Sequence, residues 1–184
     1  MKKILPFILL AGIGFLSYSC DSSDDVVVQN PGTDSDTVPL MKDLTGTFTA
    51  ADKYVLNADI SIEKTDVVLV YRKVGTAWQQ IPKTVYVDPS TSASPRKFDY
   101  NFVFDNQLVQ VRIDDANFNL GSMSSAEASN YLTNQTFRIV LVFANAGKSA
   151  GKSAAKANVD YSDYNAVVKY YNLDESKVQT INVK

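Results

Sequence analysis

The chain of 184 residues carries a formal net charge of −2 and contains one cysteine and no histidine. These counts exclude hydrolysis by a serine or cysteine nucleophile with a histidine base, the common zinc sites built from histidine and thiolate, and a disulfide framework. Hydrophobic residues make up 45% of the chain, which allows a packed core, and no basic stretch is dense enough to indicate nucleic-acid binding.

Residues 1–19 have the layout of a bacterial export signal. Lys2 and Lys3 give a basic start, residues 4–16 are apolar, and small residues follow up to Cys20. The apolar run is shorter than the roughly 20 residues that a membrane-spanning helix needs. We therefore expect a signal peptide that is removed rather than a retained membrane span.

The five residues from Leu16 to Cys20 (LSYSC) resemble the cleavage region of bacterial lipoprotein precursors. In that family the cysteine receives lipid on its sulfur and becomes the mature N-terminus, so the resemblance implies that Cys20 is lipidated. Here the branched apolar residue stands four places before the cysteine rather than three. The alternative is ordinary signal-peptidase cleavage after Ser19, but this would leave a lone thiol without a partner in an oxidising compartment.

Three acidic residues, Asp21, Asp24 and Asp25, follow the cysteine closely. A short acidic run at this place resembles the surface-export signal of Bacteroidota lipoproteins, and residues 1–25 as a whole are similar to small lipoproteins of that group. The resemblance implies a lipid anchor in the outer membrane and display on the cell surface. A position facing the periplasm is the alternative, because an acidic run is also typical of a solvated tether.

Residues 20–45 contain mainly Asp, Ser, Thr, Pro, Asn and Gly. So little apolar surface cannot offset the entropy of ordering, and we expect a lipidated, flexible tether. Within it, Asp36-Thr37-Val38 resembles an O-glycosylation site of exported Bacteroidota proteins, which would place a glycan on Thr37. Three residues match often by chance, so an unmodified tether is the favoured interpretation.

The domain proper is predicted at residues 46–184 and begins with strands. Four are expected in its first half, at residues 56–62, 66–74, 78–81 and 84–87. The first alternates between apolar and polar side chains, and the second is apolar on both faces, as in a central strand. Gly75-Thr76 allows a hairpin between the second and third strands, and Pro82 separates the third from the fourth.

A second hairpin follows the polar loop at residues 88–97. Residues 98–104 place four aromatic side chains on one face, Asp105-Asn106 supplies the turn, and residues 109–113 alternate again. This is the clearest element in the sequence.

The last part of the chain mixes strand and helix patterns. Residues 122–131 could form one or two helical turns, with Ser124 or Ser125 as the N-cap. Further strands are predicted at residues 136–143 and 177–183. Between these two strands a helix is predicted with Ser162 as its cap, because one apolar stripe is formed by Tyr164, Val167, Val168 and Tyr171.

Several short strands with turn signals between them favour a mainly all-β fold. We predict an antiparallel β-sandwich, immunoglobulin-like in architecture, with one short C-terminal helix packed on an end or edge. Alternating strand and helix units are missing, which argues against a doubly wound parallel sheet.

Residues 146–153 (AGKSAGKS) satisfy a relaxed phosphate-loop pattern after an apolar strand. Three observations oppose nucleotide binding: Ala146 replaces the first glycine, no amphipathic helix starts after Ser153, and the stretch is a tandem copy of one tetrapeptide. We expect a flexible basic surface loop and no bound nucleotide.

Carboxylates could support a hydrolase or a calcium site, and the candidates are Asp88, Asp105, Asp114 and Asp115. Adjacent acids on a strand point to opposite faces, and no regularly spaced calcium loop is present. Solvated strand ends are the favoured interpretation, with no catalytic residue, metal or cofactor expected.

Aromatic side chains are the remaining candidates for binding. Trp78, Tyr71 and Tyr86 could share one exposed face and stack on sugar rings, although core packing is the more common role for such residues. The function expected from the sequence is a lipid-anchored, non-catalytic module at the outer membrane that binds a glycan, a surface polymer or a protein. The alternatives are a glycan-active enzyme that uses carboxylates alone and a structural envelope lipoprotein without a ligand.

Overall fold

The computed structural model describes residues 40–63, 66–89, 91–142 and 159–183. They belong to one compact unit, Asp36–Lys184. The strands are Leu40–Gly46 (β1), Val55–Asp59 (β2), Val67–Val74 (β3), Ala77–Gln80 (β4), Lys83–Tyr86 (β5), Lys97–Phe104 (β6), Leu108–Asp114 (β7), Gln135–Val142 (β8) and Gln179–Asn182 (β9). The helices are Ser125–Tyr131 (α1) and Tyr164–Tyr171 (α2), and short 3-10 turns lie at Leu120–Ser122 and Glu175–Lys177.

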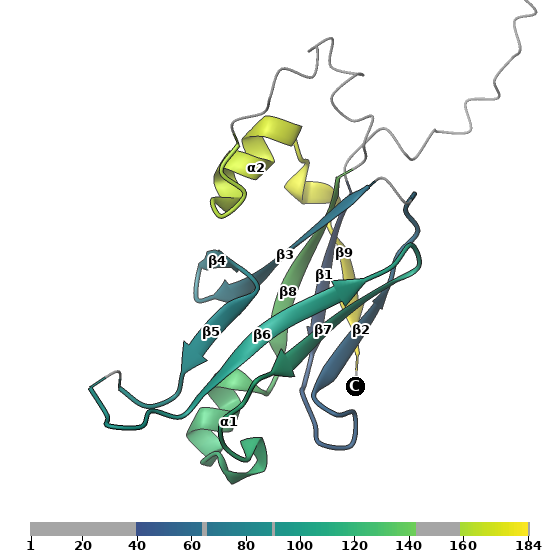
Figure 1. Ribbon diagram of the computed structural model, residues 1–184. Coiled ribbons are helices and arrows are strands. Elements are labelled where there is room, and N and C mark those ends of the chain that lie inside the picture. The colour runs from purple at the N-terminus through teal and green to yellow at the C-terminus, as the bar shows by residue number, and fades with distance from the viewer. Residues whose placement is uncertain (1–39, 64–65, 90, 143–158, 184) are drawn as a thin grey trace, which may run out of the picture. The chain divides into compact units, whose positions relative to one another are not determined.

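Two β-sheets form the described part of the unit (Figure 1). One has the strand order β4-β3-β8-β1-β9, and the other has the order β2-β7-β6-β5. Alternate side chains of both sheets fill the space between them, as the period of two in each strand requires. The fully buried members of this core include Leu44, Val70, Phe98, Tyr100, Val109, Val111, Phe137 and Ile139. The predicted mainly β sandwich is therefore confirmed.

The β6–β7 hairpin was the clearest prediction, and the structure confirms it. Its paired residues are Tyr100 with Ile113, Phe102 with Val111, and Phe104 with Val109. The Asp105 side chain accepts hydrogen bonds from the backbone N–H groups of Gln107, just before β7, and of Leu108, the first residue of β7, both at 2.8 Å. This local bonding orders the turn, as Asp does in many tight turns.

Helix α2 packs on the outer face of the five-stranded sheet near one end of the sandwich, in line with the predicted position at an end or edge. Tyr164 and Val167 of the helix are buried against Leu69, Tyr71 and Val140 of the sheet. The reason is that β3 and β8 are apolar on both faces, so the outer face also needs cover. The N-cap of α2 is Asp163 instead of the predicted Ser162.

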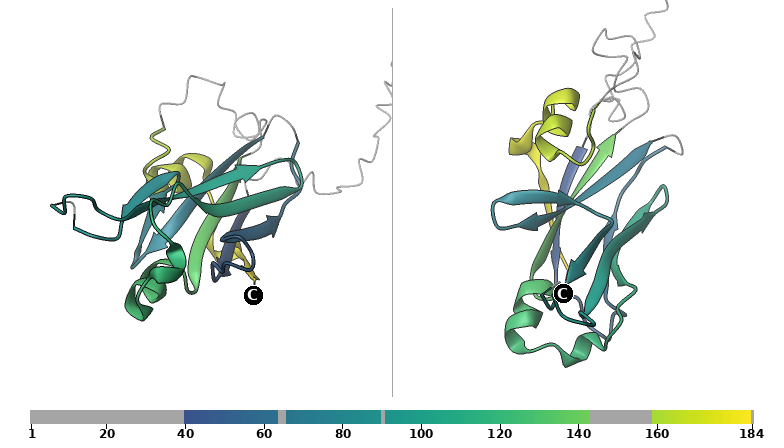
Figure 2. Two further views of the ribbon diagram at one scale, coloured as in Figure 1. Left: turned by 60° about the horizontal axis from the view of Figure 1, so that its bottom comes forward. Right: turned by 60° about the vertical axis from the view of Figure 1, so that its left-hand side comes forward.

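The segment that the sequence left ambiguous contains α1. Ser124 is its N-cap, and Ser124 and Glu127 form a reciprocal capping box. Figures 1 and 2 show α1 and α2 at opposite ends of the sandwich. Among the residues with a described position, no helix combines the length and apolar character needed to cross a bilayer.

Strand β1 lies in the segment that was assigned to the tether, so the folded domain begins before the predicted boundary at residue 46. β1 pairs with β8 along its whole length. Met41 and Leu44 are buried on its two faces, and the hydroxyls of Thr45 and Thr136 lie 2.9 Å apart. These partners are about 90 residues away in the chain, so local composition could not reveal them.

Strand β9 departs from the antiparallel prediction. It pairs with β1 in parallel, with Lys42 opposite Gln179 and Leu44 opposite Ile181. Since β8 holds the other side of β1, the first strand of the sandwich is an interior strand and the last strand is an edge.

Candidate functional site

Two cavities flank the hairpin formed by β3 and β4. The Trp78 cavity has a volume of about 530 Å³, and its lining includes Ala77, Trp78, Gln79, Gln80, Lys83 and Ser162. The Arg72 cavity has a volume of about 510 Å³, and its lining includes Arg72, Gly75, Ser129, Asn130, Asn134 and Gln135. Val74 lines both cavities, so the hairpin lies between them. Both volumes are in the range of small-molecule sites.

The indole ring of Trp78 is held in place from several sides. The Tyr164 ring of α2 lies 5.6 Å from it between centroids, and the Arg138 guanidinium lies 4.3 Å from its centroid. The Lys73 ammonium is 5.8 Å from the same ring. Trp78 is thus a fixed, partly buried wall of its cavity rather than an open stacking platform.

Beside this ring, the side chain of Gln80 is partly buried on the same face of β4, whereas the side chain of Gln79 points to the opposite face, as that of Arg72 does across the hairpin. The Gln80 amide has no hydrogen-bond partner among the described residues, although it can donate twice and accept at its oxygen. A cavity that combines a fixed aromatic wall with an unused amide can bind a polar, ring-shaped ligand.

The three aromatics predicted to share an exposed face do not do so. Tyr71 is fully buried under α2, and its hydroxyl donates to the backbone oxygen of Tyr161 at 2.7 Å. Tyr86 is 50% exposed but belongs to the other sheet. The chain passes from one sheet to the other between β4 and β5, and the sequence shows no sign of where such a crossing occurs. Only Trp78 lines a cavity described above.

Arg72 was not singled out in the sequence, and it is the most unusual side chain of the second cavity. It is only 8% exposed. Its Nη2 donates to Gln135 Oε1 at 2.6 Å and to the Asn130 carbonyl at 3.0 Å, and its Nε donates to Gln135 Oε1 at 3.1 Å. Its guanidinium carbon lies 4.6 Å from the centroid of the Tyr100 ring. One signal could have identified it, because Arg72 continues the inward alternation of Val68 and Val70.

A second buried arginine, Arg138, has a complete set of anionic partners. It donates to both carboxylate oxygens of Asp43, at 2.7 and 2.8 Å, and to Glu175 at 2.7 Å. Burial by itself lowers the pKa of Arg138, but its bonds to Asp43 and to the Tyr164 hydroxyl outweigh burial and hold that pKa above its usual range. This cluster joins β1, β8 and α2 and has a structural role.

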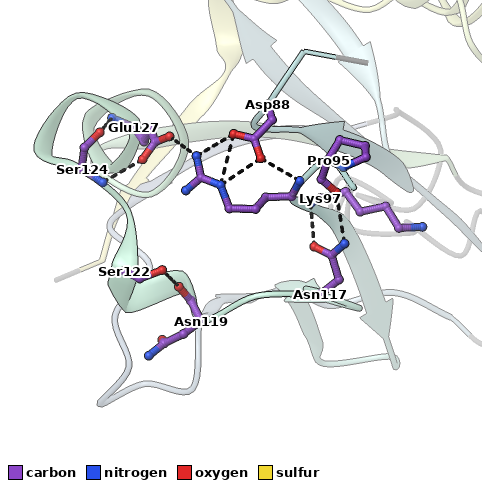
Figure 3. Close-up of polar contacts among 9 residues, drawn as sticks. Asp88, Pro95, Lys97, Asn117, Asn119, Ser122, Ser124 and Glu127 are labelled. Atoms are coloured by element: carbon purple, nitrogen blue, oxygen red, sulfur yellow. Dashed lines mark hydrogen bonds and ion pairs between the residues drawn. The ribbon is translucent and has the colours of Figure 1, made fainter. Parts of the chain in front are cut away.

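Three of the four predicted carboxylates, Asp88, Asp105 and Asp114, make local hydrogen bonds or ion pairs. Asp88 and Glu127 converge on one guanidinium group, that of Arg96, at 2.7 and 2.6 Å (Figure 3). The bonds from Arg96 hold the pKa of Asp88 below its usual range. Asp105 orders its turn, and Asp114 accepts from Arg112 at 2.8 Å. Asp115 is exposed in a left-handed backbone conformation.

None of these four acids lines the Trp78 cavity or the Arg72 cavity. Within the described ranges, no three acidic side chains come together as a metal site would need. The arrangement therefore offers the carboxylate-only enzyme no pair of facing acids in either cavity.

Several residues singled out in the sequence lie outside the described residues. They are the predicted lipidation residue Cys20, the export-signal residues Asp21, Asp24 and Asp25, the possible glycosylation residue Thr37, and the phosphate-loop-like stretch at 146–153. Comparisons with protein-family models, with curated proteins and with solved structures found no match to this chain.

Proposed function

We propose that this chain is an exported, lipid-anchored and non-catalytic binding module of the outer membrane, and that it holds a glycan in the Trp78 cavity. The observation that carries the glycan assignment is the unused amide of Gln80, which lies on the same face of β4 as the fixed indole ring of Trp78. Sugar hydroxyls both donate and accept hydrogen bonds, as amides do, and the ring faces of sugars pack on aromatic walls. Lys83 and Ser162 add further polar groups to the same cavity.

The anchor is supported by the sequence. Residues 1–25 resemble the start of Bacteroidota lipoproteins, and acyl chains on Cys20 would bind the membrane at about 0.8 kcal/mol per buried methylene. The acidic run after Cys20 favours display on the cell surface over a position facing the periplasm.

Glycan binding is tested with the full-length chain in detergent on an array of neutral glycans. We expect the variant Gln80→Ala to lose about tenfold in affinity, because the hydrogen bonds of one amide disappear. Gln107→Ala is the matched control, since this exposed glutamine lies on the β6–β7 turn away from the cavity. The proposal is wrong if no glycan binds, or if Gln80→Ala binds as well as the control.

The anchor is tested separately. Replacing Cys20 with alanine should abolish labelling by radioactive fatty acid and release the protein from the membrane fraction. Protease access to intact cells then distinguishes surface display from a periplasmic position. A Cys20→Ala protein that stays as firmly bound as the wild type would contradict lipid anchoring.

A protein ligand is a second candidate, favoured by the edge position of β4 in the five-stranded sheet. An added strand would pair with the free side of β4. This alternative predicts that Gln80→Pro, which removes a backbone N–H on the free side of β4, loses partner binding without any glycan being involved. A structural envelope lipoprotein would show neither ligand, and its deletion would alter envelope integrity.

A further inference from the structure

The charge balance of the four arginines in this chain is uneven. All four lie in the described ranges, and three of them are paired with carboxylates: Arg96 with Asp88 and Glu127, Arg112 with Asp114, and Arg138 with Asp43 and Glu175. Arg72 has no carboxylate within ion-pair distance among the described residues. It is paired only with a neutral amide, a backbone carbonyl and the Tyr100 ring.

The comparison with Arg138 shows how unusual this is. Both arginines are 8% exposed, and they lie on the neighbouring strands β3 and β8. A buried cation costs several kcal/mol of lost hydration, and a nearby anion normally repays that cost. Arg138 receives two such anions from within the chain, whereas Arg72 receives none.

The unpaired side of Arg72 is also available to a ligand. Its Nε and Nη2 atoms make all three of its hydrogen bonds, which leaves both N–H groups of Nη1 unused. Every fully enclosed side-chain nitrogen and oxygen among the described residues has a partner, so Nη1 is reachable from solvent. Arg72 lines this cavity, and Nη1 is its one guanidinium nitrogen without a hydrogen bond to a described residue.

We propose that the Arg72 cavity binds the carboxylate group of a ligand, with Arg72 Nη1 as the donor. The unpaired guanidinium supplies a positive charge for one carboxylate, and Lys73 also lines the cavity, although its ammonium lies 5.8 Å from the Trp78 ring centroid. The rest of the lining suits hydroxyl groups, because the side chains of Ser129, Asn130 and Asn134 have no hydrogen-bond partner among the described residues. The ligand class is therefore a hydroxylated carboxylic acid of the size of one acidic sugar.

This inference goes beyond the proposed function, because it concerns a second cavity and an anionic group. The two can fail independently. Gln80→Ala should leave carboxylate binding within about threefold of wild type, since Gln80 does not line the Arg72 cavity and points to the opposite face from Arg72.

The experiment compares galacturonate, galactose and inorganic phosphate by calorimetry, with the full-length chain in detergent at constant pH and ionic strength. We expect galacturonate to bind at least about tenfold more tightly than galactose, because a charge-assisted hydrogen bond is the difference between them. Arg72→Gln should remove this preference. Arg112→Gln, which alters an exposed arginine paired with Asp114, should keep it.

Because Arg72 is buried, Arg72→Gln could fail to fold, so a second variant keeps the native arginine. Ser129→Glu places a carboxylate on an exposed position of the cavity lining and should compete with the ligand, lowering galacturonate affinity at least about tenfold. Ser125→Glu is its control, with the same added charge on an exposed position of the same helix that does not line the cavity.

Three results would overturn the proposal. Equal affinity for galactose and galacturonate would show that no cation contributes. Tighter binding of phosphate than of galacturonate would assign the site to another anion. Unchanged galacturonate affinity in Ser129→Glu would place the binding elsewhere on the molecule.

Discussion

At the scale of single residues, the buried arginines show what each charge contributes to stability. Arg138 bridges Asp43 on β1 and Glu175 next to α2, but the two carboxylates differ in exposure, at 19% and 52% of their side chains. Loss of a buried partner leaves a cation that water cannot reach, whereas loss of an exposed partner is compensated by water.

We therefore expect Asp43→Asn to lower the free energy of unfolding by about 2 to 4 kcal/mol. Glu175→Gln should lower it by less than about 1 kcal/mol, since that carboxylate is half exposed. Urea denaturation followed by circular dichroism measures both values. Equal losses in the two variants would contradict the assigned roles.

Buried tyrosines make the free energy of unfolding depend on pH in the alkaline range. Burial raises the pKa of Tyr164 to about 12 from the ordinary value of 10.0, because burial together with the hydrogen bond to Glu175 outweighs the lowering effect of Arg138. Burial likewise raises the pKa of Tyr71 and of Tyr100. Between pH 10.0 and about pH 12 the unfolded chain loses tyrosine protons that the folded chain retains. The stability that is fully present below pH 10.0 is therefore lost as the pH rises.

The expected result is a free energy of unfolding that falls steadily from about pH 10 to about pH 12. Chemical denaturation at several pH values in this window measures the free energy of unfolding. The absorbance of ionised tyrosine at about 295 nm reports the titration independently. Tyr164→Phe should flatten the decline. A stability that stays constant across the window would refute the assigned burial of these hydroxyls.

At the scale of elements, the structure decides between two adjacent residues, Ser162 and Asp163, that are both suitable N-caps of α2 in the sequence. The Asp163 carboxylate accepts from the backbone N–H groups of Asn165 and Ala166, at 2.9 and 3.2 Å. Ser162 instead donates to Asp160 at 2.6 Å and is exposed. The cap of α2 is therefore Asp163.

Asp163→Ala should lower the free energy of unfolding by about 1 kcal/mol, the usual contribution of an N-cap. Ser162→Ala should change it by no more than about 0.5 kcal/mol, because it removes one exposed hydrogen bond. Thermal denaturation of the two variants under identical conditions measures the difference. A larger effect of Ser162→Ala would restore the cap predicted from the sequence.

The elements predicted well are those whose signal is local. The β6–β7 hairpin has alternation and a turn dipeptide in one continuous stretch, and the stripe from Tyr164 to Tyr171 defines α2. β1 was missed because its stabilising partners, such as Arg138 for Asp43, lie far away in the chain. The Arg72 cavity was missed for the same reason, since β3 supplies the cation and the α1–β8 region supplies the polar lining.

At the scale of the whole domain, β1 determines where an independently folding fragment must start. It is an interior strand with β8 on one side and β9 on the other. Without it, β9 has no partner strand and the buried side chains of β8 lose their neighbours on that side.

A fragment that starts at Gly46 should therefore be unfolded, whereas one that starts at Asp36 should fold, because it contains the whole compact unit. Circular dichroism and the dispersion of amide signals in NMR spectra distinguish the two outcomes. A cooperative unfolding transition in the Gly46 fragment would show that β1 is dispensable.

The interior position of β1 also decides how the domain responds to tension. Any pull on the chain that precedes Leu40 enters along the axis of this strand, while its backbone hydrogen bonds to β8 and β9 run across that axis. Such a force shears both rows of bonds together instead of peeling them open one at a time. A domain held from its front end in a flowing medium would consequently be difficult to unravel.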